Sequence, residues 1–249
     1  MKKTLLLLTL ACLMAFCCVS LAEEGAPQGE MPAFVRELMN PTLPEIVDGV
    51  KHIACVGNSI TFGSGVMIPD MDRESTYPSL LQLEVGDAYQ VLNYGMSGRT
   101  LLNEGDNPYT EQPVYTASQA SGADIFIIML GTNDSKPYNW EGNADLYRTE
   151  LEAFVRSYME LENEPDIYLM VPPKAFPVDG VIGYDIQDTV IHDEIVPIVY
   201  DVAEVLGVNL IDMYAATEDH PEWMPDGIHP DRAGNIEFAK IIAAQLVLE

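Results

Sequence analysis

Cysteine is scarce in this chain. Four occur in 249 residues, and Cys12, Cys17 and Cys18 all lie in an apolar stretch at the N-terminus, so Cys55 stands alone in the remainder. A single cysteine forms no internal disulfide and cannot build a cysteine-cluster zinc site. The stability of the folded part must therefore come from its hydrophobic core, for which 48% apolar residues are ample.

Basic residues are scarce as well. The chain has 12 lysines and arginines against 39 aspartates and glutamates, a formal net charge of −27. A field of this sign repels phosphate backbones and anionic lipid head groups, so we expect neither nucleic acid nor a membrane surface as a partner. Solubility outside the cell is sufficient to explain the acidity.

The N-terminus has the pattern of a targeting signal. Lys2 and Lys3 precede an uncharged, leucine-rich run over 4–22, and small residues at Ser20 and Ala22 suit a signal peptidase. We predict a signal peptide cut after Ala22, a secreted or periplasmic protein, and no membrane integration after cleavage. The run is also just long enough to be an uncleaved membrane anchor, which is the alternative.

The rest of the chain is divided into a lead-in and one domain. Residues 23–50, which hold Pro41 and Pro44, read as a linker and an extended lead-in. Beyond them short apolar runs alternate with segments of helical period. This alternation predicts an α/β domain over 51–249, a three-layer αβα sandwich around a five-stranded parallel sheet. The predicted strands are 52–56, 89–94, 124–130, 166–171 and 208–212, and the predicted helices are 75–86, 144–163, 189–206 and 232–248.

Ser59 is the first candidate for chemistry. It lies in Gly57-Asn58-Ser59, directly after the first predicted strand, and ligands bind at the carboxyl ends of the strands in sheets of this kind. A serine on a tight strand-to-helix turn presents its hydroxyl at the crevice, and its own N–H can point at a developing oxyanion. Taken alone, the same three residues are more typical of an ordinary turn.

Two further polar turns follow the second and third predicted strands. Gly95 could offer a backbone N–H, and Asn133 a side-chain amide, to the same oxyanion. Each turn also has a plain structural explanation, because glycine permits a sharp bend and Asn-Asp forms local backbone hydrogen bonds.

The candidate base lies just before the last predicted helix. In Asp226-Gly227-Ile228-His229 the aspartate can fold back to hold the imidazole Nδ1–H, which leaves Nε2 free as a general base. A loop aspartate beside a surface histidine is the alternative. His220 is a weaker candidate because Thr217 stands where the acid would be. No two histidines have the i, i+4 spacing of a helical zinc site, so we expect no metal.

Together the four turns resemble the SGNH subgroup of the GDSL esterase/lipase family. In that family one motif supplies each of Ser, Gly, Asn and His, and the matching positions are Ser59, Gly95, Asn133 and His229, with the family's aspartate at Asp226. The resemblance covers most of the predicted domain. The first motif departs from it, because Gly-Asn-Ser replaces the Gly-Asp-Ser that gave the family its name.

The resemblance implies a flavodoxin-like SGNH hydrolase fold and a serine esterase that needs no cofactor. The triad would be Ser59, His229 and Asp226, and the oxyanion would lie among the N–H groups of Ser59 and Gly95 and the amide of Asn133. The base would take the serine proton during attack and return it to the leaving alcohol.

Segments 56–63, 93–95 and 97–100 look most similar to bacterial carbohydrate acetylesterases of the sialate O-acetylesterase type. This implies an exported esterase that acts on O-acyl, and more narrowly O-acetyl, esters of carbohydrates, with a small-molecule or glycan ester as its partner. A lipolytic acylhydrolase or thioesterase on the same fold is one alternative. A glycan-binding module without turnover is another, which the intact set of catalytic residues disfavours.

Six residues near these turns are candidates for contact with the substrate. Aromatic faces suit sugar rings, and Arg99 could bind a carboxylate or merely neutralise neighbouring acids. Ordinary loop packing is the alternative for the aromatic side chains. The six are Asn58, Arg99, Asp134, Tyr138, Trp140 and Trp223.

Overall fold

A computed structural model describes residues 31–68 and 70–248. The predicted signal peptide and its cleavage point at Ala22 lie outside the described residues. The described residues from Pro32 onward form one compact unit, so the described part of the predicted lead-in belongs with the domain. Within the described ranges, no helix is both long and apolar enough to cross a membrane.

Five parallel strands form the sheet, in the order β2-β1-β3-β4-β5. The register pairs the last residue of β1, Gly57, with Gly95 of β2 and Met129 of β3. The polar turns that follow these strands therefore leave the sheet at one level. The strands are β1 (Lys51–Gly57), β2 (Tyr89–Gly95), β3 (Ile125–Met129), β4 (Asp166–Val171) and β5 (Asn209–Asp212).

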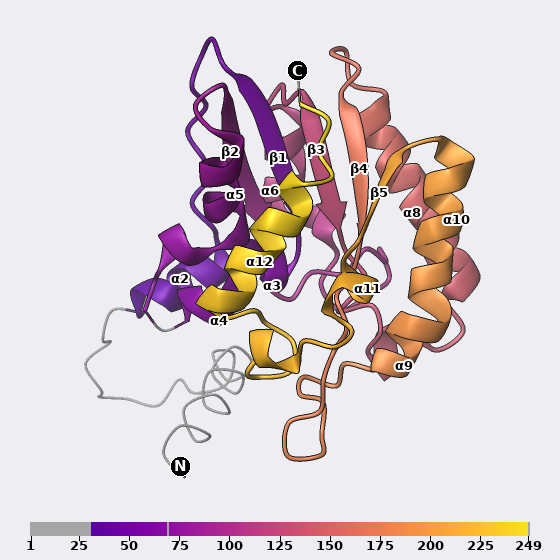
Figure 1. Cartoon of the computed structure of the whole chain (residues 1–249). Coiled ribbons are helices and arrows are strands. Elements are labelled where there is room, and N and C mark those ends of the chain that lie inside the picture. Colours follow the sequence, from indigo (N-terminus) through magenta and orange to yellow (C-terminus); the bar gives the residue numbers. More distant parts are fainter. Residues whose placement is uncertain (1–30, 69, 249) are drawn as a thin grey trace, which may run out of the picture. The chain divides into compact units, whose positions relative to one another are not determined.

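Helices cover both faces of the sheet (Figure 1). Ala54 and Val56 of β1 belong to the buried cluster on one face, and Ile53 and Cys55 to the cluster on the other. This alternation is that of a strand buried on both sides, and the predicted three-layer fold is confirmed. One layer contains α6 (Pro113–Gln119), α8 (Ala144–Met159) and α10 (Val196–Leu206), and the other contains α5 (Tyr77–Val85) and α12 (Arg232–Ala243).

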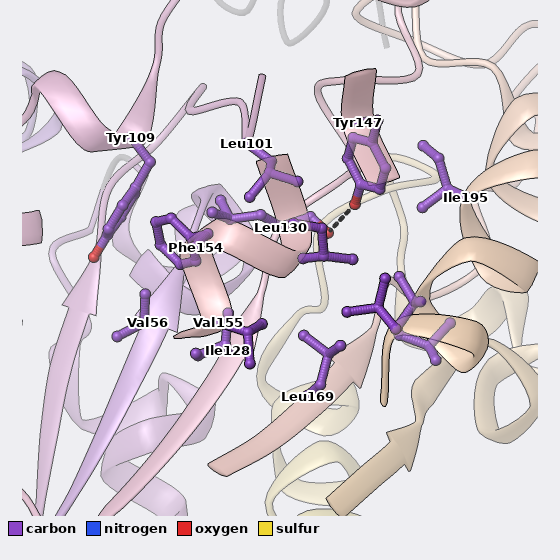
Figure 2. Packing of buried hydrophobic residues seen from close by; sticks show 14 of the residues in the cluster. Val56, Leu101, Tyr109, Ile128, Leu130, Tyr147, Phe154, Val155, Leu169 and Ile195 are labelled. Atoms are coloured by element: carbon purple, nitrogen blue, oxygen red, sulfur yellow. Dashed lines mark hydrogen bonds between the residues drawn. The ribbon is translucent and has the colours of Figure 1, made fainter. Parts of the chain in front are cut away.

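The larger cluster fixes the carboxyl end of β3. Figure 2 shows Tyr147 of α8 donating to the carbonyl of Leu130, at 3.3 Å. Tyr109 packs edge-on against Phe154 with ring centroids 6.0 Å apart, a favoured geometry for aromatic pairs. The turn that begins at Gly131 thus starts from a rigid base.

The lead-in is docked, in contrast to the linker predicted for this region. Glu37 of α2 (Ala33–Met39) forms an ion pair with Arg73 at 2.8 Å and accepts from the N–H of Thr42 at 2.6 Å. Val47 N–H donates to the side chain of Gln90, on β2, at 2.8 Å. These polar contacts, rather than a hydrophobic pattern, hold the segment, and periodicity gave no sign of them.

Pro197 shapes the crossover between β4 and β5. The predicted helix 189–206 is divided into α9 (Asp188–Val190), a π-helical turn over Ile191–Ile195, and α10. Proline has no N–H to donate to the carbonyl four residues earlier, and the preceding residue, Val196, bonds to Ile191 instead, five residues back. The remaining short elements are α3 (Ser59–Phe62), α4 (Ser64–Met67), α7 (Pro137–Trp140), α11 (Met213–Thr217) and the 3₁₀ turns Arg73–Ser75, Tyr109–Glu111 and Pro221–Trp223.

Candidate active site

Ser59 is the first residue of α3, on a turn that its neighbours force. Asn58 caps the helix by accepting from Ile60 N–H at 3.1 Å. A Cβ on Gly57 would lie 2.2 Å from Thr61 Oγ1, so only glycine fits there. The Ser59 N–H has no hydrogen-bond partner among the described residues, as expected in the first turn of a helix.

His229 bridges Ser59 and Asp226. Its Nε2 lies 2.9 Å from Ser59 Oγ, and its Nδ1 lies 2.7 Å from Asp226 Oδ2. His229 is therefore within hydrogen-bond distance of both Asp226 and Ser59, which lies 170 residues earlier in the chain, in the expected order. This is the geometry in which an imidazole can take a hydroxyl proton while an acid fixes its orientation.

Asp226 is held by backbone as well as by His229. Its Oδ1 accepts from the N–H groups of His229, at 2.7 Å, and Ile228, at 2.9 Å. Burial acts to raise the pKa of Asp226, but the contact with His229 and these N–H bonds outweigh it and lower the pKa below its ordinary value. The carboxylate thus stays charged beside the imidazole.

Gly227 makes this loop possible. It has a φ of +86°, which disfavours side chains, and a Cβ there would lie 2.1 Å from the carbonyl oxygen of Phe176. Asp231 then caps α12 by accepting from Gly234 N–H at 2.9 Å. The loop is consequently fixed between a close backbone contact and a helix start.

The N–H of Gly95, the predicted oxyanion donor, already has a hydrogen-bond partner. Its N–H donates to the side chain of Asn93 at 2.8 Å, and a Cβ would lie 2.1 Å from Phe62 N. Packing against α3 therefore explains why residue 95 is glycine, and its N–H already has a hydrogen-bond partner. Gly98, three residues on, has a φ of +80°, open space where a Cβ would lie, and an N–H without a partner among the described residues.

Asn133 lies beside the Gly98 turn. Its side-chain amide donates one hydrogen to the carbonyl of Arg99 at 3.0 Å, and an amide has a second hydrogen to offer. Its own carbonyl accepts from Asn139 at 2.9 Å. The structure therefore brings the β3 turn and the β2 turn into contact.

Asp134 is structural rather than a contact for substrate. It is fully buried and accepts from Leu101 N–H at 2.9 Å and Leu102 N–H at 2.8 Å. Burial raises its pKa to about 6, although these N–H groups act in the opposite direction. Asn58 is likewise fully buried, so its task is the cap on α3.

Arg99 is engaged within the protein. Its Nη1 donates to the carbonyl of Ser97 at 2.8 Å and its Nη2 to Gln112 at 3.3 Å. Burial lowers its pKa from the ordinary value, opposed by the charge of Asp106. Its Nε is buried without a partner in the described part of the chain, so that atom does not face a ligand.

The three aromatic candidates have different environments. Trp140 is buried and packs edge-on against Tyr147. Trp223 is stacked face to face with His220, with centroids 3.9 Å apart. Tyr138 is exposed, with Lys136 above its ring. Neither tryptophan therefore has both faces free for a sugar.

Tyr184 was not predicted from the sequence, yet it touches the candidate base. Its ring lies edge-on to that of His229, with centroids 5.6 Å apart. It follows β4 in the segment 172–187, which has no periodic pattern. The signal that could have found it is its place after the carboxyl end of a parallel strand.

The other histidines are engaged elsewhere. His220 Nδ1 lies 2.9 Å from Glu222, His192 Nδ1 lies 2.6 Å from Asp193, and His52 Nε2 lies 2.9 Å from a backbone carbonyl. Across residues 31–68 and 70–248, no three His, Cys, Asp or Glu side chains are grouped so that they could hold a metal ion.

Known proteins share both the sequence and the fold. The GDSL-like lipase/acylhydrolase family matches residues 55–235. An acetylxylan esterase from Xylanibacter ruminicola is 36% identical over 82% of this chain and 45% of its own length, so this chain spans about half of that relative.

Two solved structures share the fold at lower identity. A carbohydrate acetylesterase from Sinorhizobium meliloti has a TM-score of 0.59 and 21% identity over 78% of this chain and 97% of its own. An aryl esterase from M. smegmatis has a TM-score of 0.58 and 23% identity, over 79% and 98%. The family match covers more than half of the chain and includes the Ser59 and Asn133 turns and the Asp226–His229 loop, so the chain belongs to the GDSL-like lipase/acylhydrolase family.

Proposed function

We propose that this protein is an exported carboxylic ester hydrolase that removes acetyl groups from carbohydrate hydroxyls, with Ser59 as nucleophile. The observation that carries the proposal is the unbroken relay Ser59–His229–Asp226, with contacts of 2.9 and 2.7 Å. No other arrangement in the described residues offers a hydroxyl, a base and an orienting acid in sequence.

In the first half of the reaction, His229 Nε2 takes the proton of Ser59 Oγ as that oxygen attacks the ester carbonyl. The negative charge on the carbonyl oxygen is met by the N–H of Ser59 and the second amide hydrogen of Asn133. For the third donor we propose Gly98 in place of Gly95, because the Gly98 N–H has no hydrogen-bond partner in the described part of the chain. Each such donor is worth roughly 3–4 kcal/mol of barrier.

In the second half, the protonated His229 gives its proton to the leaving alcohol, and Ser59 is left as an acetyl ester. A water molecule then loses a proton to His229 and attacks the acetyl carbonyl. Collapse of the second tetrahedral species releases acetate and restores the serine hydroxyl. Asp226 remains charged throughout and stabilises the imidazolium in both halves.

The similar proteins support a substrate class. The relative at 36% identity is an acetylxylan esterase, which supports an acetyl group and a carbohydrate alcohol. A lipolytic acylhydrolase or thioesterase would use the same relay on other substrates. A non-catalytic glycan-binding module would have no use for the relay, and for this reason we favour the enzyme.

Hydrolysis of p-nitrophenyl esters of increasing chain length, by wild type and Ser59→Ala, tests the proposal. We expect acetate to be cleaved faster than octanoate, and Ser59→Ala to lose at least about 10³-fold in kcat. Hydrolysis that survives in Ser59→Ala would contradict the mechanism, and a preference for octanoate would favour the lipolytic alternative. Acetate release from acetylated xylan, compared with O-acetyl sialic acid, then identifies the alcohol.

A further inference from the structure

The segment between β4 and α9 is hydrogen-bonded at one end to the loop of His229 and at the other to the turn of Asn133. Phe176 N–H donates to the carbonyl of Gly227, in the loop of the base, at 2.8 Å. At the other end, the side chain of Gln187 donates to the carbonyl of Ser135 at 2.8 Å, two residues after Asn133. Figure 1 shows the segment as a hairpin that projects beyond the carboxyl ends of the strands.

Tyr184 lies on the returning arm of this hairpin in an unusual conformation. It has a φ of +59° and Asp185 has a φ of +60°, a region that aromatic side chains avoid. Such outliers persist only where surrounding contacts impose them, and they cluster at functional sites. Here the strain places the ring edge-on to His229, 5.6 Å between centroids, with 41% of the residue still exposed.

The position of the Tyr184 ring determines which part of the substrate it can contact. His229 Nε2 delivers its proton to the leaving alcohol, so the alcohol oxygen must lie next to the imidazole at that moment. The ring of Tyr184 lies beside the same imidazole, so it is within reach of the remainder of the alcohol. A sugar presents faces of C–H groups, and these pack on aromatic rings much as other apolar groups do.

We infer that Tyr184 is a specificity-determining residue whose ring packs against the sugar ring of the departing alcohol. The inference rests on the proposed function and adds to it the residue that selects a carbohydrate over a small alcohol. Esters of acyclic alcohols have no ring to place there, so they gain nothing from Tyr184.

The test uses the full chain with Tyr184→Ala and Tyr184→Phe, on O-acetylated xylose oligomers and on ethyl acetate. We expect Tyr184→Ala to raise KM for the oligomers by about three- to tenfold, with kcat/KM for ethyl acetate changed less than about twofold. Tyr184→Phe keeps the ring and should stay close to wild type on both. Tyr200→Ala, a tyrosine with the same 41% exposure on α10, is the matched control and should change neither.

Each other outcome has a definite meaning. Equal losses on both esters with Tyr184→Ala, or no loss on the oligomers, would overturn the inference and leave the esterase in place. Ser59-dependent hydrolysis of ethyl acetate without any of the oligomers would remove the carbohydrate substrate and Tyr184's role together. Absence of Ser59-dependent hydrolysis of either ester would instead overturn the proposed function. Oligomer binding to Ser59→Ala, measured by calorimetry with and without Tyr184→Ala, checks the contact independently of turnover.

Discussion

Asp226 performs two tasks with its two oxygens. Oδ1 holds the N–H groups of its own loop and Oδ2 holds the imidazole of His229. The same carboxylate therefore shapes the loop and sets the tautomer of the base, which must have its proton on Nδ1 for Nε2 to accept one.

Replacement of Asp226 separates these tasks. In Asp226→Asn the carbonyl oxygen can still accept the backbone N–H groups, but the amide presents hydrogens to Nδ1 and favours the wrong tautomer. We expect kcat for p-nitrophenyl acetate to fall by about 10³–10⁴ with KM little changed. Asp231→Asn, which keeps a good cap on α12, is the control. An active Asp226→Asn enzyme would show that the acid is not needed.

The sequence singled out Ser59, His229 and Asp226 because each lies close to the end or start of a predicted element, and the structure places them in contact; their catalytic roles stay predictions. For the third donor the sequence predicted Gly95, the last residue of β2. The proposal of Gly98 depends on the hydrogen bond that the Gly95 N–H donates to the Asn93 side chain, which no local pattern reveals.

At the scale of elements, buried polar contacts hold the turns that carry the relay. Asp134, at the end of the β3 turn, accepts two N–H groups from Leu101 and Leu102 on the β2 side. Sequence periodicity predicted the strands and long helices from their apolar faces. It had no means to predict the docked lead-in or the hairpin of Tyr184, because polar contacts and strained backbone fix both.

The pKa of Asp134 makes the stability provided by its hydrogen bonds to Leu101 and Leu102 depend on pH. Its folded value of about 6 exceeds the unfolded value of about 4, so between these values the folded chain retains a proton that the unfolded chain has lost. The contribution of Asp134 to the free energy of unfolding is therefore fully present below about pH 4 and falls as pH rises to about 6.

The Asp134→Asn side chain does not titrate. The difference in unfolding free energy between wild type and this variant therefore isolates the contribution of Asp134. The free energy of unfolding of wild type relative to Asp134→Asn should fall by about 3 kcal/mol between roughly pH 3.5 and 6.5. Urea denaturation at a series of pH values measures it. A constant difference over this range would mean that the pKa of Asp134 is the same in the folded and unfolded chain, and a rising one that it is lowered by folding.

At the scale of the whole molecule, the net charge of −27 and the N-terminal pattern support an exported enzyme that meets neutral substrates. The proposed export predicts that chain recovered outside a bacterial cytoplasm begins at Glu23, after loss of the run ending at Ala22. N-terminal sequencing or intact mass measures this. Recovery with residues 1–22 attached would favour the membrane anchor instead.

The central claim is that Ser59 is a nucleophile activated by His229, and covalent labelling tests it directly. Incubation with diethyl p-nitrophenyl phosphate, followed by peptide mass spectrometry, should place one diethylphosphoryl group on Ser59. The label should be absent from Ser59→Ala, much slower to form in His229→Ala, and unchanged in His220→Ala. No label in wild type, a label on another residue, or equal labelling rates in wild type and His229→Ala would contradict the account.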